Sequence, residues 1–180
     1  MSPNQALTDR SIQESIADTV ASLLRFQGIE IWEKRSPVET PSADLRVILQ
    51  LDAAHPDNPD LNGIAVFYPS HLQSARLAQL LHKTILRTID IRSQGVQSVH
   101  QETTNPETAN PETADPETAD PETADLETSQ MTDTGIPTVY LTVGFVGGRE
   151  DSINLGNAEY RDCMAQAIAT GILKYIQTAL

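Results

Sequence analysis

Residues 137–151 read PTVYLTVGFVGGRED, an apolar run that passes into a segment rich in glycine and charged residues. The β-branched and aromatic side chains of PTVYLTV predict a buried strand, and GFVGGRED predicts a loop. Thr142 lies near the point where the predicted strand ends. Its hydroxyl is either that of an ordinary strand residue with a hydrogen-bond partner or the remnant of a group that once carried out chemistry.

A long helix is expected after this loop, between Ala158 and Gln177. Its apolar side chains recur at the spacing of one buried helical face. The predicted core residues of this helix are Tyr160, Met164, Ala167, Ile168, Gly171, Ile172 and Tyr175.

Toward the N-terminus, helical and strand patterns alternate. The expected elements are a helix from Thr8 or Ser11 to about Phe26, strands at 29–35, 45–51 and 63–68, and a helix from about Ser70 to Ile89. Gly28 is a typical residue for the end of the first helix, and residues 52–63 are rich in Pro, Asn and Asp, which predicts a loop. Alternation of this kind predicts a layered α/β domain with a largely parallel sheet.

A repeat with a period of five residues interrupts the pattern between residues 100 and 129. Each unit resembles NPETA or DPETA and offers almost no apolar surface to offset an ordering entropy of about 1–2 kcal/mol per residue. We therefore expect an extended, disordered acidic insertion between two parts of one domain, residues 1–99 and 130–180. An acidic docking segment or a metal-collecting segment is the alternative.

The charge of the chain is concentrated in this repeat. The formal net charge is −13, and nine acidic residues without any Lys or Arg lie in the repeat, so the rest of the chain carries −4. The absence of a basic patch argues against nucleic acid as a partner. Cys163 is the single cysteine, so the chain cannot form an internal disulfide.

The N-terminus and the apolar runs bear on localisation. MSPNQALTDR lacks the charged and apolar regions of a signal peptide, and no apolar run approaches the roughly 20 residues that span a bilayer. As written, the sequence predicts a cytoplasmic protein without a membrane span. A true start codon further upstream, with a signal peptide, would make it an exported protein.

Several motifs together resemble the zinc-dependent N-acetylmuramoyl-L-alanine amidases, the cell-wall hydrolases of the amidase-3 type. IPTVYLTVGF (136–145) is similar to the family's Met-Pro-apolar strand and V-E-x-G-F turn, and AEYRDCMAQAIATGILKYI (158–176) is similar to its last helix. NGIAVFYPS (62–70) resembles the family's NG-apolar strand, and residues 74–96 resemble its helix that ends in R-x-R-G-V. The first helix and residues 29–35 match more weakly.

The resemblance implies a fold and an activity. The fold is an α/β sandwich, a twisted sheet with helices on both faces, and here its first strand is missing. The activity is hydrolysis of the amide that joins the lactyl group of peptidoglycan to L-alanine. Such chemistry uses a zinc ion with three protein ligands and an open position for water, together with a carboxylate that moves the proton.

The residues at the family's metal positions depart from its pattern. The first His belongs to a D-P-G-H-G-G motif that has no counterpart here, and a misassigned start codon would explain that gap. Asp9 aligns with the Glu ligand, although a first-turn helix residue is the simpler interpretation. Asp52 aligns with the second His, in QLDAA (50–54) against S-I-H-A-N. His55 is an alternative ligand or a solvated turn residue.

Thr142 aligns with the catalytic Glu of V-E-x-G-F, and a hydroxyl cannot replace that carboxylate near neutral pH. The resemblance therefore implies a degenerate amidase without bound zinc or hydrolysis, which could bind peptidoglycan, an intact amidase or its regulator. The edge left by the missing strand predicts self-association and marginal stability. Two rivals remain: an active amidase with an atypical Asp-containing metal site, and a spacer whose selected part is the acidic repeat.

The other polar residues carry weaker signals. His71 and His82 are interpreted as structural helix residues, and His100 opens the repeat. Arg92 and Gly95 fit a turn at a helix end. The glycines after Thr142 lack the spacing of a phosphate-binding loop, and no G-x-S-x-G motif indicates a serine nucleophile.

Overall fold

A computed structural model describes residues 9–32, 43–53, 60–99 and 135–179. The predicted acidic repeat, residues 33–35 of the predicted strand, His55 and His100 lie outside these ranges. In chain order the described elements are α1 (Asp9–Phe26), β1 (Arg46–Ala53), β2 (Ile64–Pro69), α2 (Leu72–Thr88), β3 (Ser93–Val99), β4 (Thr138–Val146), α3 (Arg149–Gly156) and α4 (Ala158–Ala179).

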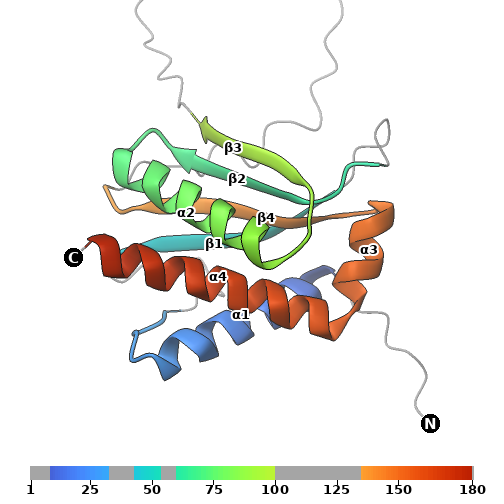
Figure 1. Ribbon diagram of the computed structural model, residues 1–180, viewed down its shortest axis with the longest axis horizontal. Helices are drawn as coiled ribbons and strands as arrows, with labels where there is room; N and C mark the ends of the chain where they lie inside the picture. Colours follow the sequence, from blue (N-terminus) through green and yellow to red (C-terminus); the bar gives the residue numbers. More distant parts are fainter. Residues whose placement is uncertain (1–8, 33–42, 54–59, 100–134, 180) are drawn as a thin grey trace, which may run out of the picture.

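The described strands form one sheet in the order β1-β4-β2-β3 (Figure 1). β1 is parallel to β4 and β2 is parallel to β3, whereas β2 and β4 are antiparallel. The α/β fold with a sheet flanked by helices is thus confirmed. The sheet is mixed, because one parallel pair of strands lies on each side of the antiparallel pair β2–β4. β4, which contains Thr142, lies between β1 and β2 and is buried along almost its whole length.

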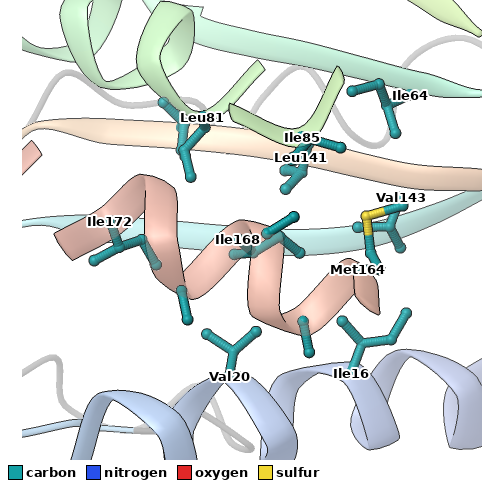
Figure 2. Packing of buried hydrophobic residues seen from close by; sticks show 14 of the residues in the cluster. Ile16, Val20, Ile64, Leu81, Ile85, Leu141, Val143, Met164, Ile168 and Ile172 are labelled. Atoms are coloured by element: carbon teal, nitrogen blue, oxygen red, sulfur yellow. The ribbon is translucent and has the colours of Figure 1, made fainter. Parts of the chain in front are cut away.

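The core lies between one face of this sheet and the helices α1, α2 and α4. Figure 2 shows side chains from these helices converging with those of β2 and β4. The fully buried members include Ile16, Leu77, Leu81, Ile85, Leu141, Val143, Met164 and Ile168. Each such side chain stabilises the fold by about 1.5–3 kcal/mol relative to leaving it exposed, so the periodic apolar faces of the helices account for their packing.

α4 occupies the middle of the helical layer and touches both α1 and α2. Gly171 permits the close approach of α2, because a Cβ built there would lie 2.8 Å from Leu81 Cδ2. The predicted core face of α4 is confirmed: its residues are buried, except for Tyr160, which is partly buried against the same cluster.

The two faces of β4 follow the alternation of a strand. Val139, Leu141 and Val143 belong to the helix-side core. Tyr140 and Thr142 alternate with them and therefore point to the opposite face, where they are also buried.

Three predicted boundaries were wrong. Residues 29–32 form no strand; instead, Ile29 N–H donates to Leu24 O and closes the end of α1, where Gly28 has a φ of 79°. Gly95 lies inside β3 rather than in a turn at a helix end. The segment 144–151, predicted as a loop, contains the end of β4 and the start of α3.

These errors share a physical cause. β3 reads SQGVQSV and is largely exposed, so it has no apolar alternation to predict it, and its pairing with β2 supplies the stabilisation. α3 has only eight residues, two of them buried, which gives little helical periodicity.

β1 forms one edge of the sheet within the described residues. Arg46 N–H donates to Pro137 O, which orients the backbone groups of Arg46 and of every second residue toward β4. The backbone groups of Val47, Leu49 and Leu51 therefore point to the outer edge. There Gln13 of α1 donates a side-chain hydrogen bond to Leu49 O. Across the described residues, no helix is both long and apolar enough to span a bilayer.

Candidate functional site

The candidate site lies at the carboxyl ends of β1 and β4. Because these strands are parallel, Asp52 near the end of β1 and Phe145 near the end of β4 meet at the same edge of the sheet. β2 runs antiparallel to β4, so its first residues and the preceding Asn62–Gly63 reach that edge as well. Ligands of α/β proteins commonly bind at such an edge.

Thr142 is paired with Gln50 across the β1–β4 junction. Gln50 Nε2 donates to Thr142 Oγ1 at 3.2 Å. Thr142 has 0% exposure and Gln50 is half-buried. Since β4 continues to Val146, Thr142 lies in the interior of the strand rather than at its last position. An amide and a hydroxyl do not ionise near neutral pH, so this pair offers no general base.

Asp52 does not face Thr142. Gln50 is paired with Thr142, and Asp52, two residues further along β1, is paired with Phe145 after a one-residue shift in the register. The sequence alignment of QLDAA therefore missed Gln50 as the cross-strand neighbour of Thr142. Alternation of residues within β1 could not reveal this, because the pairing depends on the register between two strands that are far apart in the sequence.

Asp9 is the first residue of α1 and is exposed, as expected of an acidic residue in the first turn of a helix. The helix reaches β1 one turn later, through the hydrogen bond from Gln13 to Leu49 O. In the described ranges, no three His, Cys, Asp or Glu side chains lie close enough together to hold a metal ion. Zinc sites in enzymes use three such ligands, so the described side chains near Thr142 do not fit a zinc ion.

Asp151 is the best-buried acidic residue in the described part of the chain, with 2% exposure. Its Oδ2 accepts hydrogen bonds from the backbone N–H groups of Gly63 and Phe145, both at 2.8 Å. Burial raises the pKa of the Asp151 carboxyl, although the two N–H donors oppose that shift. Asp151 thus joins the start of α3 to the end of β4 and the start of β2.

Asn62 complements Asp151 in this junction. Its Oδ1 accepts hydrogen bonds from the N–H groups of Glu150 and Asp151, which are unsatisfied donors of the first turn of α3. Its backbone oxygen accepts a hydrogen bond from Gln94 Nε2. Neither Asn62 nor Asp151 was predicted from the sequence, because their contacts connect segments that are more than 80 residues apart.

A polar cleft of about 260 Å³ lies beside the Asn62–Asp151 junction. Its lining residues are Asn62, Gly63, Asp90, Ile91, Arg92, Glu150, Asp151 and Asn154. Arg92 Nη2 and Glu150 Oε1 form an exposed ion pair at 3.5 Å across it. The lining combines carboxylates, amides and a guanidinium, so it suits a small polar ligand with hydrogen-bonding groups, and it includes no nucleophilic Ser, Cys or Lys.

The two histidines in the described residues lie away from Thr142. His82 Nε2 and Ser93 Oγ are 2.6 Å apart, which joins α2 to β3, and burial lowers the pKa of His82. His71 is the N-cap of α2 and makes no side-chain capping bond. The His82–Ser93 contact joins α2 to a neighbouring strand, in agreement with a structural role for His82.

Comparison with known proteins gives a consistent result. Residues 27–174 match the family profile described as N-acetylmuramoyl-L-alanine amidase. None of the curated proteins compared with the chain matches it. Among solved structures, the amidase AmiC2 of Nostoc punctiforme is similar with a TM-score of 0.69 and 24% identity, covering 98% of this chain and 89% of that chain.

Two clostridial structures show the same fold. An N-acetylmuramoyl-L-alanine amidase from Clostridium difficile 630 is similar with a TM-score of 0.70 and 19% identity, covering 96% of this chain and 86% of that chain. The CwlD amidase of Clostridioides difficile, solved in complex with the GerS lipoprotein, has a TM-score of 0.68 and 17% identity, with coverage of 98% and 91%.

Proposed function

The chain belongs to the N-acetylmuramoyl-L-alanine amidase family, and we propose that it binds peptidoglycan without hydrolysing it. One observation carries this proposal: a buried threonine, hydrogen-bonded to a glutamine, stands where the resemblance to the family predicts the catalytic carboxylate. The family acts on the amide between the lactyl group and L-alanine, so the glycan-linked peptide is the ligand we propose.

The chemistry of amide hydrolysis supports the loss of activity. A positioned general base contributes about 10²–10⁴ in rate, and a zinc-bound water supplies the nucleophile. Gln50 and Thr142 supply neither a proton acceptor nor an anionic ligand. Asp9 and Asp52 retain carboxylates at the aligned ligand positions, and they are the residues that an active variant of the site would need.

The polar cleft supports the binding part of the proposal. Its amides, carboxylates and guanidinium offer both donors and acceptors to a peptide. It lies at the same edge of the sheet as Asp52 and Phe145, so a ligand could bind there without needing a reactive group.

The test combines a hydrolysis assay with a binding assay on the same purified chain. Dye-labelled peptidoglycan sacculi are incubated with the protein and zinc, and released dye and co-sedimenting protein are both measured. We expect co-sedimentation without release of dye. Dye release that a chelator abolishes, and that Asp52→Asn removes, would instead establish an active amidase with an Asp-containing metal site.

Binding needs a matched control, because sacculi are highly charged and adsorb proteins. Arg92→Glu changes the cleft lining at an exposed position and is expected to reduce co-sedimentation. Arg87→Glu makes the same change in charge at an exposed position of α2 outside the cleft and is expected to leave it unchanged. Equal loss in both variants would indicate non-specific charge effects and contradict the cleft assignment.

To meet peptidoglycan, the chain must reach the cell envelope, which cell fractionation can test.

The outer edge of β1 also provides backbone groups for pairing with a second copy. Val47→Pro removes an outward N–H and leaves the β1–β4 bonds in place, so it should reduce self-association in sedimentation velocity; an unchanged distribution would rule out this edge.

A further inference from the structure

The junction between β1 and β4 contains a polar contact on the face of the sheet away from the helices. Gln50 Nε2 donates to Thr142 Oγ1 at 3.2 Å, and Thr142 has no exposed surface. A buried hydroxyl or amide that loses its partner is costly, because water cannot replace the lost bond. The contact therefore contributes to holding two strands whose residues are 92 positions apart in the sequence.

The same two positions are poorly suited to a cation. Zinc prefers thiolate, imidazole and carboxylate donors, whereas an amide and a hydroxyl are neutral. The nearest acidic side chain along β1 is that of Asp52, which is paired with Phe145 and not with Thr142. Within the described ranges, no cluster of three potential ligands compensates for this.

We infer that the Gln50–Thr142 hydrogen bond replaces, in this chain, the catalytic carboxylate that the resemblance places at Thr142, and that no zinc ion binds beside it. Gln50, and not Asp52, is the cross-strand partner of Thr142, and the pair holds β1 against β4 without a cation. The inference rests on the proposed function, since it explains how this face of the sheet is stabilised without the catalytic carboxylate. It adds that Asp52 takes no part in metal binding.

A double-mutant cycle tests the contact directly. Gln50→Leu and Thr142→Val keep nearly the same volume and remove one polar partner each, so folded variants are expected. Each single change should lower the Tm, because it leaves the other group buried without a partner. The double variant should lose less than the sum of the two, with a difference of about 3 °C. Additive losses would overturn the inference.

Gln97 provides the matched control. It lies on β3, which is separated from β4 by β2, and it is exposed. Gln97→Leu combined with Thr142→Val should therefore be additive. Coupling as large as that of Gln50 would show that the effect is a general response of the sheet, and this would also overturn the inference.

Zinc provides the second measurement. The Tm of the full chain and of Asp52→Asn should be unchanged by zinc, because ligand binding to the native state alone would raise it. A rise in the unmodified chain that Asp52→Asn abolishes would overturn the inference. Failure of the proposed function is distinguishable: amide hydrolysis would contradict that function, whereas additive losses without hydrolysis would contradict the Gln50–Thr142 contact alone.

Discussion

The two faces of β4 are equally inaccessible to water but differ in chemistry. Leu141 and Val143 face the helices and pack among apolar side chains. Thr142, between them in sequence, faces the opposite side and is held by Gln50. The apolar face is sufficient to assemble the domain, since it joins α1, α2 and α4 into one core. The packing of the helices therefore places little constraint on the residues of the polar face.

The largest effect should come from the apolar face. Leu141→Ala removes a fully buried side chain and leaves a cavity, so we expect a loss of about 2–5 kcal/mol in the free energy of unfolding. Thr142→Val, one residue away, should cost about 1 kcal/mol, because it removes one hydrogen bond and keeps the volume. Urea denaturation of both variants measures the contrast. Equal losses would contradict the separation of the two faces.

The next effect concerns the junction at the carboxyl end of β4. Asp151→Ala leaves the buried N–H groups of Gly63 and Phe145 without their acceptor, so a loss of about 2–3 kcal/mol is expected. Asp151→Asn retains an acceptor oxygen and should lose less. If thermal or urea unfolding gave the same stability for Asp151→Ala as for the unmodified chain, the junction would be dispensable.

The pH dependence of this junction should be smaller and has a definite sign. Burial raises the pKa of Asp151 above its ordinary value of 3.8, so the native state binds the proton more tightly than the unfolded chain does. The contribution of this carboxyl to stability is therefore complete below pH 3.8 and is lost as the pH rises through the raised pKa.

A comparison with Asp151→Asn isolates that contribution, because the other carboxylates are common to both proteins. Relative to the variant, the unmodified chain should gain stability in urea unfolding as the pH falls from 7 to 4. A relative loss of stability over this range would show that hydrogen bonds from the backbone outweigh the effect of burial.

The smallest effect should come from the rim of the cleft. Arg92 and Glu150 are both largely exposed and 3.5 Å apart, and such surface pairs are worth about 0–1 kcal/mol. Arg92→Ala should therefore change stability little at physiological salt. A loss comparable to that of Asp151→Ala would make the ion pair part of the structural junction instead of the ligand surface.

Much of the fold follows from local patterns. The helices α1, α2 and α4 were predicted from their apolar spacing, and β4 from its β-branched and aromatic side chains. β3 was not predicted, because its polar residues carry no alternation, and α3 was not predicted because it depends on capping by Asn62 from a distant loop.

The candidate site was predicted less completely. Thr142 was singled out from the sequence, and the structure adds its partner Gln50. Asn62 and Asp151 were missed, since neither belongs to a motif and their role exists only where three segments meet.

The sequence by itself determined which segments are apolar and periodic, and hence the helices, the central strand and the layered α/β class. Those properties are local, because each depends on side chains within a few turns or one strand. Tertiary structure alone decided that Gln50 rather than Asp52 meets Thr142. Strand register joins residues far apart in the chain, and no local pattern sets it: it pairs Gln50 with Thr142 and Asp52 with Phe145.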